Sequence, residues 1–166
     1  MSKSITKEYL DTLFRYSFDD GILTWAVKRR GTKGIGNEAG SLRKNGYVQI
    51  NIDGKLYFAH RLIWMLATGE WPKKELDHIN GVRSDNRLEN LREADAFQNH
   101  QNQKRPSNNK SGTKGVCWNV SSGKWSCFVA INGKSKYWGS FTLKEDAEAR
   151  VKSVRESIHG EFANHG

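Results

Sequence analysis

The chain has 166 residues, of which 36% are hydrophobic, and its mean hydropathy is −0.76. This length allows one medium domain or two small ones, and the low hydrophobic content favours small modules with much surface. No apolar run approaches the roughly 20 residues that a membrane span needs, and the N-terminus has no signal-peptide pattern. We therefore expect a cytoplasmic protein that does not bind a membrane.

The sequence contains only two cysteines, Cys117 and Cys127. Two cysteines cannot supply a zinc site with four cysteine ligands, and they do not indicate a disulfide framework. Both side chains are expected to be reduced thiols.

The formal net charge is +9, and its distribution is more informative than its size. Residues 104–136 contain seven Lys or Arg and no Asp or Glu. Such a segment can be a solvated basic face, but here aromatic residues lie between the charges, which favours nucleic acid as the partner. We expect double-stranded DNA as that partner, no protein partner, and a monomer.

The first half of the chain predicts a small mixed domain. A helix is expected over 4–16 with Ser4 as its cap, followed by the apolar run ILTWAV over 22–27 and a basic loop over 28–40. Strands over 46–52 and 55–59 are joined by Asp53-Gly54, a strong hairpin signal. A helix over 60–69 then ends at Gly69, and His60 at its start is interpreted as a hydrogen-bonded structural histidine, although it could also be a ligand.

The segment LDHINGVRSDNRLENLREADAFQNHQN, residues 76–102, carries the candidate chemistry. It predicts a strand, a loop, a second strand and a helix over 93–103, and the helix would return Asn99 to Asp77 and His78. His78 is the candidate general base because its ordinary pKa lies near neutral pH. Asp77 and Asn99 offer the oxygen ligands that Mg²⁺ prefers, with Mn²⁺ as an alternative cation. The loop would be held by side-chain hydrogen bonds of Asn90 and Asn86.

A polar linker is expected over 104–112, and it separates a domain over 1–103 from a domain over 113–166. Beyond the linker the sequence predicts three strands and a helix over 143–160. Alternation along the middle strand buries the face that carries Trp125, Cys127 and Val129 and leaves the opposite face open. The predicted class is α+β, with a three-stranded antiparallel sheet packed on one helix in the second domain.

Residues 20–103, and above all DHINGVRSDNRLENL and QNHQN, resemble the HNH homing-type endonucleases of the ββα-metal superfamily found in phages and mobile introns. The resemblance implies that Asp77 and Asn99 bind the metal, that His78 is the general base, and that Asn90 is the middle, structural Asn of the catalytic motif. The neighbouring His100 is an alternative to Asn99 as the metal ligand at the last position of the motif. Cleavage would leave 5′-phosphate and 3′-hydroxyl ends.

Residues 111–163 are similar to the plant APETALA/ethylene-response-factor DNA-binding domain, in which the open face of the sheet enters the major groove. Several arginines of that family are replaced here by Cys117, Asn119 and Ala130. The residues expected to contact DNA are therefore Lys114, Asn119, Lys124, Ser126 and Tyr137.

The sequence thus predicts a metal-dependent DNA endonuclease of homing type, in which the basic second domain contributes DNA affinity and the first domain contributes the chemistry. Two alternatives remain open. One is a DNA-binding regulator with an inactive HNH fold, and the other is a structural RNA-binding protein, whose binding would survive chelation of metal.

Overall fold

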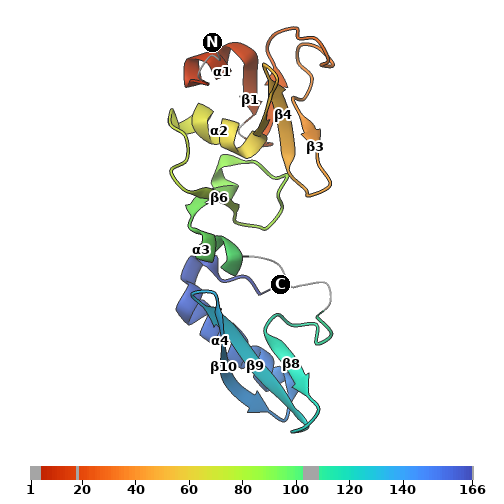
Figure 1. The fold of residues 1–166 in the computed structure, drawn as a ribbon, viewed down its shortest axis with the longest axis vertical. Helices are drawn as coiled ribbons and strands as arrows, with labels where there is room; N and C mark the ends of the chain where they lie inside the picture. Colours follow the sequence, from red (N-terminus) through yellow and green to blue (C-terminus); the bar gives the residue numbers. More distant parts are fainter. Residues whose placement is uncertain (1–4, 18, 103–108, 166) are drawn as a thin grey trace. The chain divides into compact units, whose positions relative to one another are not determined.

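The computed structural model describes residues 5–17, 19–102 and 109–165. Contacts within it divide the chain into two compact units, Met1–Ala94 and Asp95–Gly166 (Figure 1). Over the described ranges the units are built from four α-helices and several small antiparallel sheets, so the α+β class is confirmed. No helix in these ranges is long and apolar enough to cross a membrane.

The first unit begins with helix α1 (Lys7–Leu13), which runs directly into strand β1 (Phe14–Ser17). Strand β1 pairs antiparallel with β2 (Ile22–Trp25), and Phe14 lies opposite Trp25. The predicted helix over 4–16 is therefore too long, because its last residues gain hydrogen bonds and ring packing in a strand pair. Thr6 accepts from the backbone N of Tyr9 at 3.3 Å and caps the helix, whereas the predicted cap, Ser4, lies outside the described residues.

A three-stranded antiparallel sheet follows in the order β3 (Ser41–Leu42), β4 (Val48–Ile52), β5 (Lys55–Phe58). The turn between β4 and β5 is confirmed at Asp53-Gly54, where both residues have positive φ, 50° and 83°. Helix α2 (Ala59–Thr68) starts at once after β5 and ends at Gly69, whose φ of 81° is the left-handed conformation that glycine favours. The two-residue strand β3 was not expected from the sequence.

The last part of the first unit is a two-stranded antiparallel sheet of β6 (Glu75–His78) and β7 (Leu91–Ala94). The second strand starts later than predicted, because Leu88–Asn90 form a 3₁₀ turn, η1. In the register of the pair, Asp77 lies opposite Arg92 and His78 lies opposite Leu91.

The hydrophobic core of the first unit lies between its two helices and its sheets. Burying these apolar side chains is the main driving force that fixes the positions of the elements. The largest fully buried members are Leu10, Ile50, Ile52, Leu62 and Ile63.

The second unit begins with the short helix α3 (Ala96–Gln101), capped at Asp95 by a reciprocal pair of hydrogen bonds with Gln98. The Nζ of Lys114 donates to the carbonyl of Gln101 at 2.9 Å, and the side chain of Asn164 donates to the carbonyl of Asn102 at 2.8 Å. These bonds group α3 with the C-terminal residues. The structural units therefore divide before Asp95, whereas the sequence placed the boundary at the linker over 104–112.

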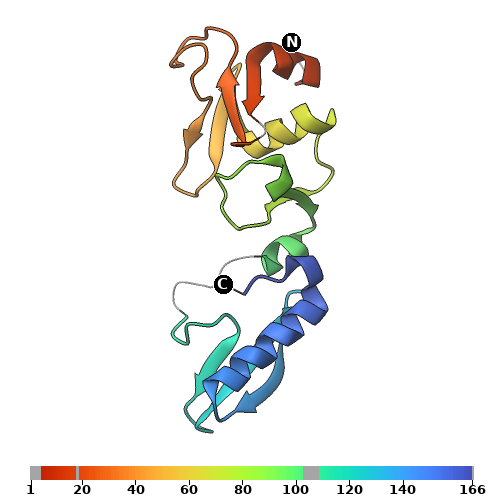
Figure 2. The same ribbon diagram turned by 180° about the vertical axis from the view of Figure 1, so that it is seen from behind.

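The remaining elements of the second unit are β8 (Val116–Asn119), β9 (Lys124–Ile131), β10 (Lys134–Phe141), helix α4 (Lys144–His159) and the 3₁₀ turn η2 (Gly160–Phe162). The three strands form an antiparallel sheet in the order β10-β9-β8, and α4 covers one face of it (Figure 2). Val116, Cys127 and Val129 pack with Ala147, Val151 and Val154 of the helix. This arrangement is the predicted sheet on one helix.

Gly115 is a point where the second unit leaves no room for a side chain. Its φ is +82°, and a Cβ placed there would lie 2.3 Å from the carbonyl oxygen of Phe128. Gly123 also has positive φ, +61°, but a Cβ there would meet nothing within 4 Å.

We expect Gly115→Ala to lower the free energy of unfolding of the second unit by about 3 kcal/mol or more, because a clash with backbone adds to the conformational strain. Gly123→Ala should cost only about 1 kcal/mol, the strain of positive φ alone. Urea denaturation of the full chain measures both values. Equal losses in the two variants would contradict the importance of the contact with Phe128.

Candidate active site

His78 ends strand β6 and is almost fully buried, with 3% of its surface exposed. Its Nε2 lies 3.1 Å from the Oδ1 of Asn86, which is equally buried. An amide oxygen only accepts hydrogen bonds, so Nε2 carries the proton and the basic lone pair of the neutral ring is on Nδ1. Burial lowers the pKa of His78, although the hydrogen bond to Asn86 and the charge of Asp77 act against this. The imidazole is therefore neutral at neutral pH and can act as a base.

Asp77 precedes His78 on the same strand, and its side chain is also buried. The Oδ2 atom accepts from Nε of Arg92 at 3.0 Å and from Nη2 at 2.9 Å. The two residues face each other across the β6–β7 pair, so the register itself brings the charges together. The ion pair compensates for the loss of hydration at the buried carboxylate.

The loop between β6 and η1 is held by the side-chain amide of Asn90, as expected. Its Oδ1 accepts from the backbone N of Asn80 at 3.0 Å. Its Nδ2 donates to the side chain of Asn80 at 3.1 Å and to the carbonyl of Asp85 at 2.7 Å. Asn86 differs from the expected backbone tie, because its oxygen contacts the ring of His78 instead.

The other predicted metal ligand, Asn99, lies on α3 in the second unit, as does the alternative ligand His100. Asp77 belongs to the first unit, so a shared role of Asp77 and Asn99 as ligands stays a prediction. Within the described ranges, no three His, Cys, Asp or Glu residues are grouped in a way that could hold a metal. The predicted pair nevertheless offers carboxylate and amide oxygens, which are the ligands that Mg²⁺ takes.

His60, at the start of α2, is a second imidazole at this site. Its ring lies edge-on to that of His78 with 5.1 Å between the centroids, and it stacks on Phe58 at 5.4 Å. Its Nδ1 is buried and has no hydrogen-bond partner among the described residues, so the expectation of a hydrogen-bonded histidine fails for this atom. Burial, with the nearby His78 and Arg61, lowers the pKa of His60 to about 3. In the sequence, the one indication that this ring could be buried was the position of His60 at the start of an apolar helix.

The residues predicted to contact DNA differ in how accessible they are. The Nζ of Lys114 is bound to Gln101, and burial lowers the pKa of this lysine to about 8. Ser126 is buried, with its Oγ 3.0 Å from that of Ser140. The remaining three predicted residues are exposed, and strand register and alternation place them on the open face of the sheet: Asn119, Lys124 and Tyr137.

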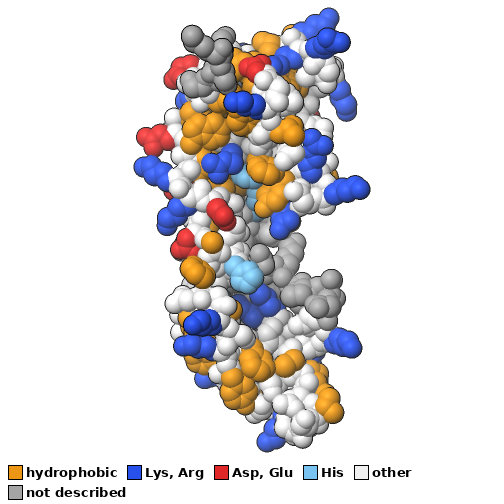
Figure 3. All heavy atoms as spheres, viewed as in Figure 1, with side chains coloured by type: hydrophobic (Ala, Val, Ile, Leu, Met, Phe, Trp, Pro, Cys, Tyr) orange, Lys and Arg blue, Asp and Glu red, His pale blue; other side chains and the backbone are white. Residues whose placement is uncertain are grey.

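The first unit has a further cationic surface, a cavity of about 520 Å³ beside the β3-β4-β5 sheet. Its lining includes four cationic side chains and one acidic side chain, Arg29, Arg30, Lys33, Arg43 and Glu38. Figure 3 shows that Lys and Arg side chains outnumber acidic ones on the visible surface of this unit.

Comparison with known proteins bears on these groups of residues. Residues 57–101 match the family model described as HNH endonuclease. The chain is 36% identical over 105 residues to Protein 3.8 of Escherichia phage T7, an alignment that covers 63% of this chain and 86% of the phage protein. No solved structure matches.

The chain belongs to the family of this phage protein and carries an HNH endonuclease domain. The HNH match runs from β5 to α3 and includes Asp77, His78, Asn86, Asn90 and Asn99. It supports a nuclease-like enzyme with a nucleic-acid substrate. The likeness of the second unit to the ethylene-response-factor domain is not supported by these comparisons, and it stays a prediction.

The buried neutral state of His60 makes the HNH domain sensitive to acid. Below the ordinary pKa of 6.5 the unfolded chain binds a proton at this residue, whereas the folded chain does not until its own pKa of about 3. The contribution of His60 is therefore complete above pH 6.5 and is lost as the pH falls through the window between these values.

We expect the free energy of unfolding of the first unit to fall by about 2 kcal/mol between pH 7 and pH 5 through this residue. In His60→Phe that part of the pH dependence should disappear, even if the variant is less stable at pH 7. Urea denaturation at the two pH values measures it, with His100→Gln, at an exposed histidine, as the control. An unchanged pH dependence in His60→Phe would show that His60 is not buried as a neutral ring.

Proposed function

We propose that this protein is a metal-dependent DNA endonuclease of homing type, which hydrolyses phosphodiester bonds to 5′-phosphate and 3′-hydroxyl ends. The observation that carries the proposal is the neutral imidazole of His78, held by Asn86 beside the carboxylate of Asp77 within the region that matches HNH endonucleases. A base, an oxygen ligand and a nuclease family match coincide in one short segment.

In the proposed reaction, Nδ1 of His78 takes a proton from a water molecule as its oxygen forms a bond to phosphorus. The bond from phosphorus to the 3′ oxygen breaks, and the leaving oxygen gains a proton from solvent. Asp77 and Asn99 would hold Mg²⁺ or Mn²⁺, which stabilises the negative charge of the phosphate when bound. Arg92 keeps the carboxylate of Asp77 in place, and Asn90 keeps the loop in the shape that presents Asn86 to His78.

The second unit is proposed to bind double-stranded DNA through the open face of its sheet. Asn119 and Lys124 lie side by side in the register of β8 and β9, and both are exposed. Tyr137 is 59% exposed on the same face, next to Phe128 with 5.7 Å between ring centroids. The polar pair suits a contact with a phosphate, and the two aromatic rings suit stacking on a base or packing on a sugar.

Lys124 is the one lysine of the strands that register places on this open face. Lys136 lies opposite Val129, whose side chain points toward α4, so its side chain leaves the sheet on the other face. These two exposed lysines therefore form a matched pair for mutagenesis, with one lysine on each face of the sheet.

The central test is cleavage of supercoiled plasmid DNA and of phage DNA by the wild-type protein with Mg²⁺. We expect nicked or linear product, loss of product with EDTA, and a rate in His78→Ala that is lower by a factor of about 100 to 10,000, the usual contribution of a general base. Affinity for DNA should stay near the wild-type value, because His78 is a neutral, buried side chain.

Two paired variants serve as controls for this test. Asn99→Ala should lose metal-dependent cleavage, whereas His100→Ala should keep it if Asn99 rather than His100 binds the metal with Asp77. A wild-type protein that binds both DNAs and cuts neither with Mg²⁺ or Mn²⁺ would refute the nuclease and favour the DNA-binding regulator. Preference for RNA duplexes in the presence of EDTA would favour the RNA-binding alternative.

We expect Lys124→Gln to reduce the slope of log affinity against log salt concentration by about 0.9, the loss of one phosphate contact on duplex DNA. Lys136→Gln should leave that slope unchanged. Fluorescence anisotropy titrations of a labelled duplex at several salt concentrations, with EDTA present, give the slopes. Equal slopes for both variants would mean that the open face does not carry the phosphate contact.

A further inference from the structure

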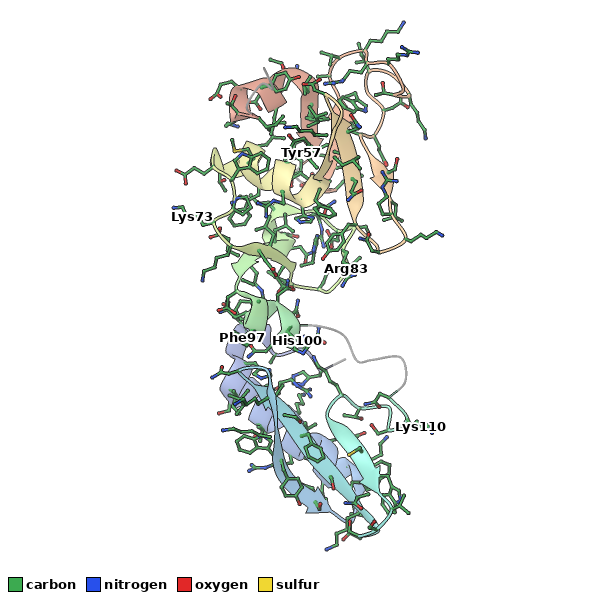
Figure 4. All side chains as sticks on the ribbon, in the orientation of Figure 1. Tyr57, Lys73, Arg83, Phe97, His100 and Lys110 are labelled. Carbon is green, nitrogen blue, oxygen red and sulfur yellow. The ribbon has the colours of Figure 1, made fainter. Side chains whose placement is uncertain are left out.

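Arg83 lies on the loop between β6 and β7, and its side chain is exposed (Figure 4). Its guanidinium carbon is 5.0 Å from the ring centroid of Tyr47, in a cation–π contact. Its Nη1 donates to the carbonyl of Asn45 at 3.0 Å. Both partners come from the turn between β3 and β4, so two contacts from another part of the first unit fix the direction of a side chain that is normally mobile.

Arg83 differs from its neighbours in having no acidic partner among the described residues. Arg87, on the same loop, pairs with both Asp85 and Glu89. Arg92 on β7 pairs with Asp77. A guanidinium has five N–H donors in a planar fork, and the hydrogen bond to Asn45 uses only one nitrogen. Arg83 therefore retains its full charge and most of its donors for an external anion.

Tyr47 connects this cation to the candidate base. The ring that carries Arg83 is 5.9 Å from the ring of His78, centroid to centroid, and 5.4 Å from that of His60. The arginine and the base thus both contact the same aromatic side chain.

We propose that Arg83 binds the phosphate that is cut, holding its non-bridging oxygens beside His78. The inference deepens the proposed nuclease function and depends on it. A guanidinium matches two phosphate oxygens at once, and a cation that is already oriented loses little entropy when the anion binds. Its charge would also stabilise the additional negative charge that develops on these oxygens as water attacks phosphorus.

A purely structural role is the competing explanation, because the same side chain joins the β3–β4 turn to the β6–β7 loop. Removal of such a connection would lower stability and disturb the site without any role in binding phosphate. The test therefore needs a readout that a structural connection does not affect. Rescue by free guanidinium ion supplies one, since the added ion can replace a bound cation but cannot tie two loops together.

The experiment measures single-turnover cleavage at saturating duplex DNA with Mg²⁺. We expect Arg83→Gln to be about 100-fold slower than wild type, the usual effect of removing one group that stabilises the transition state. Arg83→Lys should recover part of this loss, because lysine keeps the charge without the fork. The matched control is Lys44→Gln, an exposed cation of the β3–β4 turn that Arg83 contacts, which should stay within about threefold of wild type, as expected for a general charge contact.

Arg83→Ala should be rescued about tenfold or more by free guanidinium at concentrations that leave the protein folded, and not by the same concentration of K⁺. A wild-type rate in Arg83→Gln, or a loss equal to that of Lys44→Gln, would overturn the inference while leaving the nuclease function intact. A slow Arg83→Ala that guanidinium does not rescue would assign the structural role instead. Absence of cleavage by the wild-type protein would overturn both proposals.

Discussion

The geometry of the candidate site depends on two buried asparagine side chains. An amide that is removed from water must form hydrogen bonds inside the protein, or its burial costs free energy. Asn90 meets this need by binding Asn80 and the carbonyl of Asp85, which fixes the loop after β6. Asn86, on the loop so fixed, presents its oxygen to His78. The orientation of the candidate base is therefore a consequence of how a turn satisfies its own polar groups.

Much of the secondary structure could be predicted because the signals were local. Asp53-Gly54 specifies a tight turn, and Gly69 ends a helix, whatever the rest of the chain does. The errors occur where contacts with a segment distant in the sequence decide the local secondary structure. Phe14 belongs to a strand because Trp25 lies opposite it, and the helical spacing of the preceding residues carries no information about that partner. The assignment of helix α3 to the second unit was unpredictable for the same reason, because it depends on hydrogen bonds with the distant residues Lys114 and Asn164.

The candidate site was predictable in composition but not in contacts. Asp77, His78 and Asn86 could be selected by residue type and spacing, because the chemistry requires a carboxylate, an imidazole and amides. That Asp77 is paired with Arg92 depends on the register of β6 and β7, which the shifted start of β7 made uncertain. The exposure of the predicted DNA contacts was even harder to predict from the sequence. Lys114 has the right charge for DNA, yet its side chain is used to hold α3 within the second unit.

The ion pairs of the first unit determine which of its cations face solvent without a partner. Its arginines Arg29, Arg87 and Arg92 are neutralised by Asp53, Asp85 and Asp77. Among the described residues of this unit, Arg83 and the cavity-lining cations Arg30, Lys33 and Arg43 have no acidic partner, so positive charge remains on surfaces that a polyanion could cover. Contacts of this kind weaken with salt, because the counterions that DNA loses on binding gain less entropy when they enter a more concentrated salt solution. The imidazole of His78 is neutral and buried, and salt has little influence on such a group. Ionic strength would therefore affect the affinity for DNA more than the proton transfer to His78, since the first depends on exposed cations and the second on a neutral, buried ring.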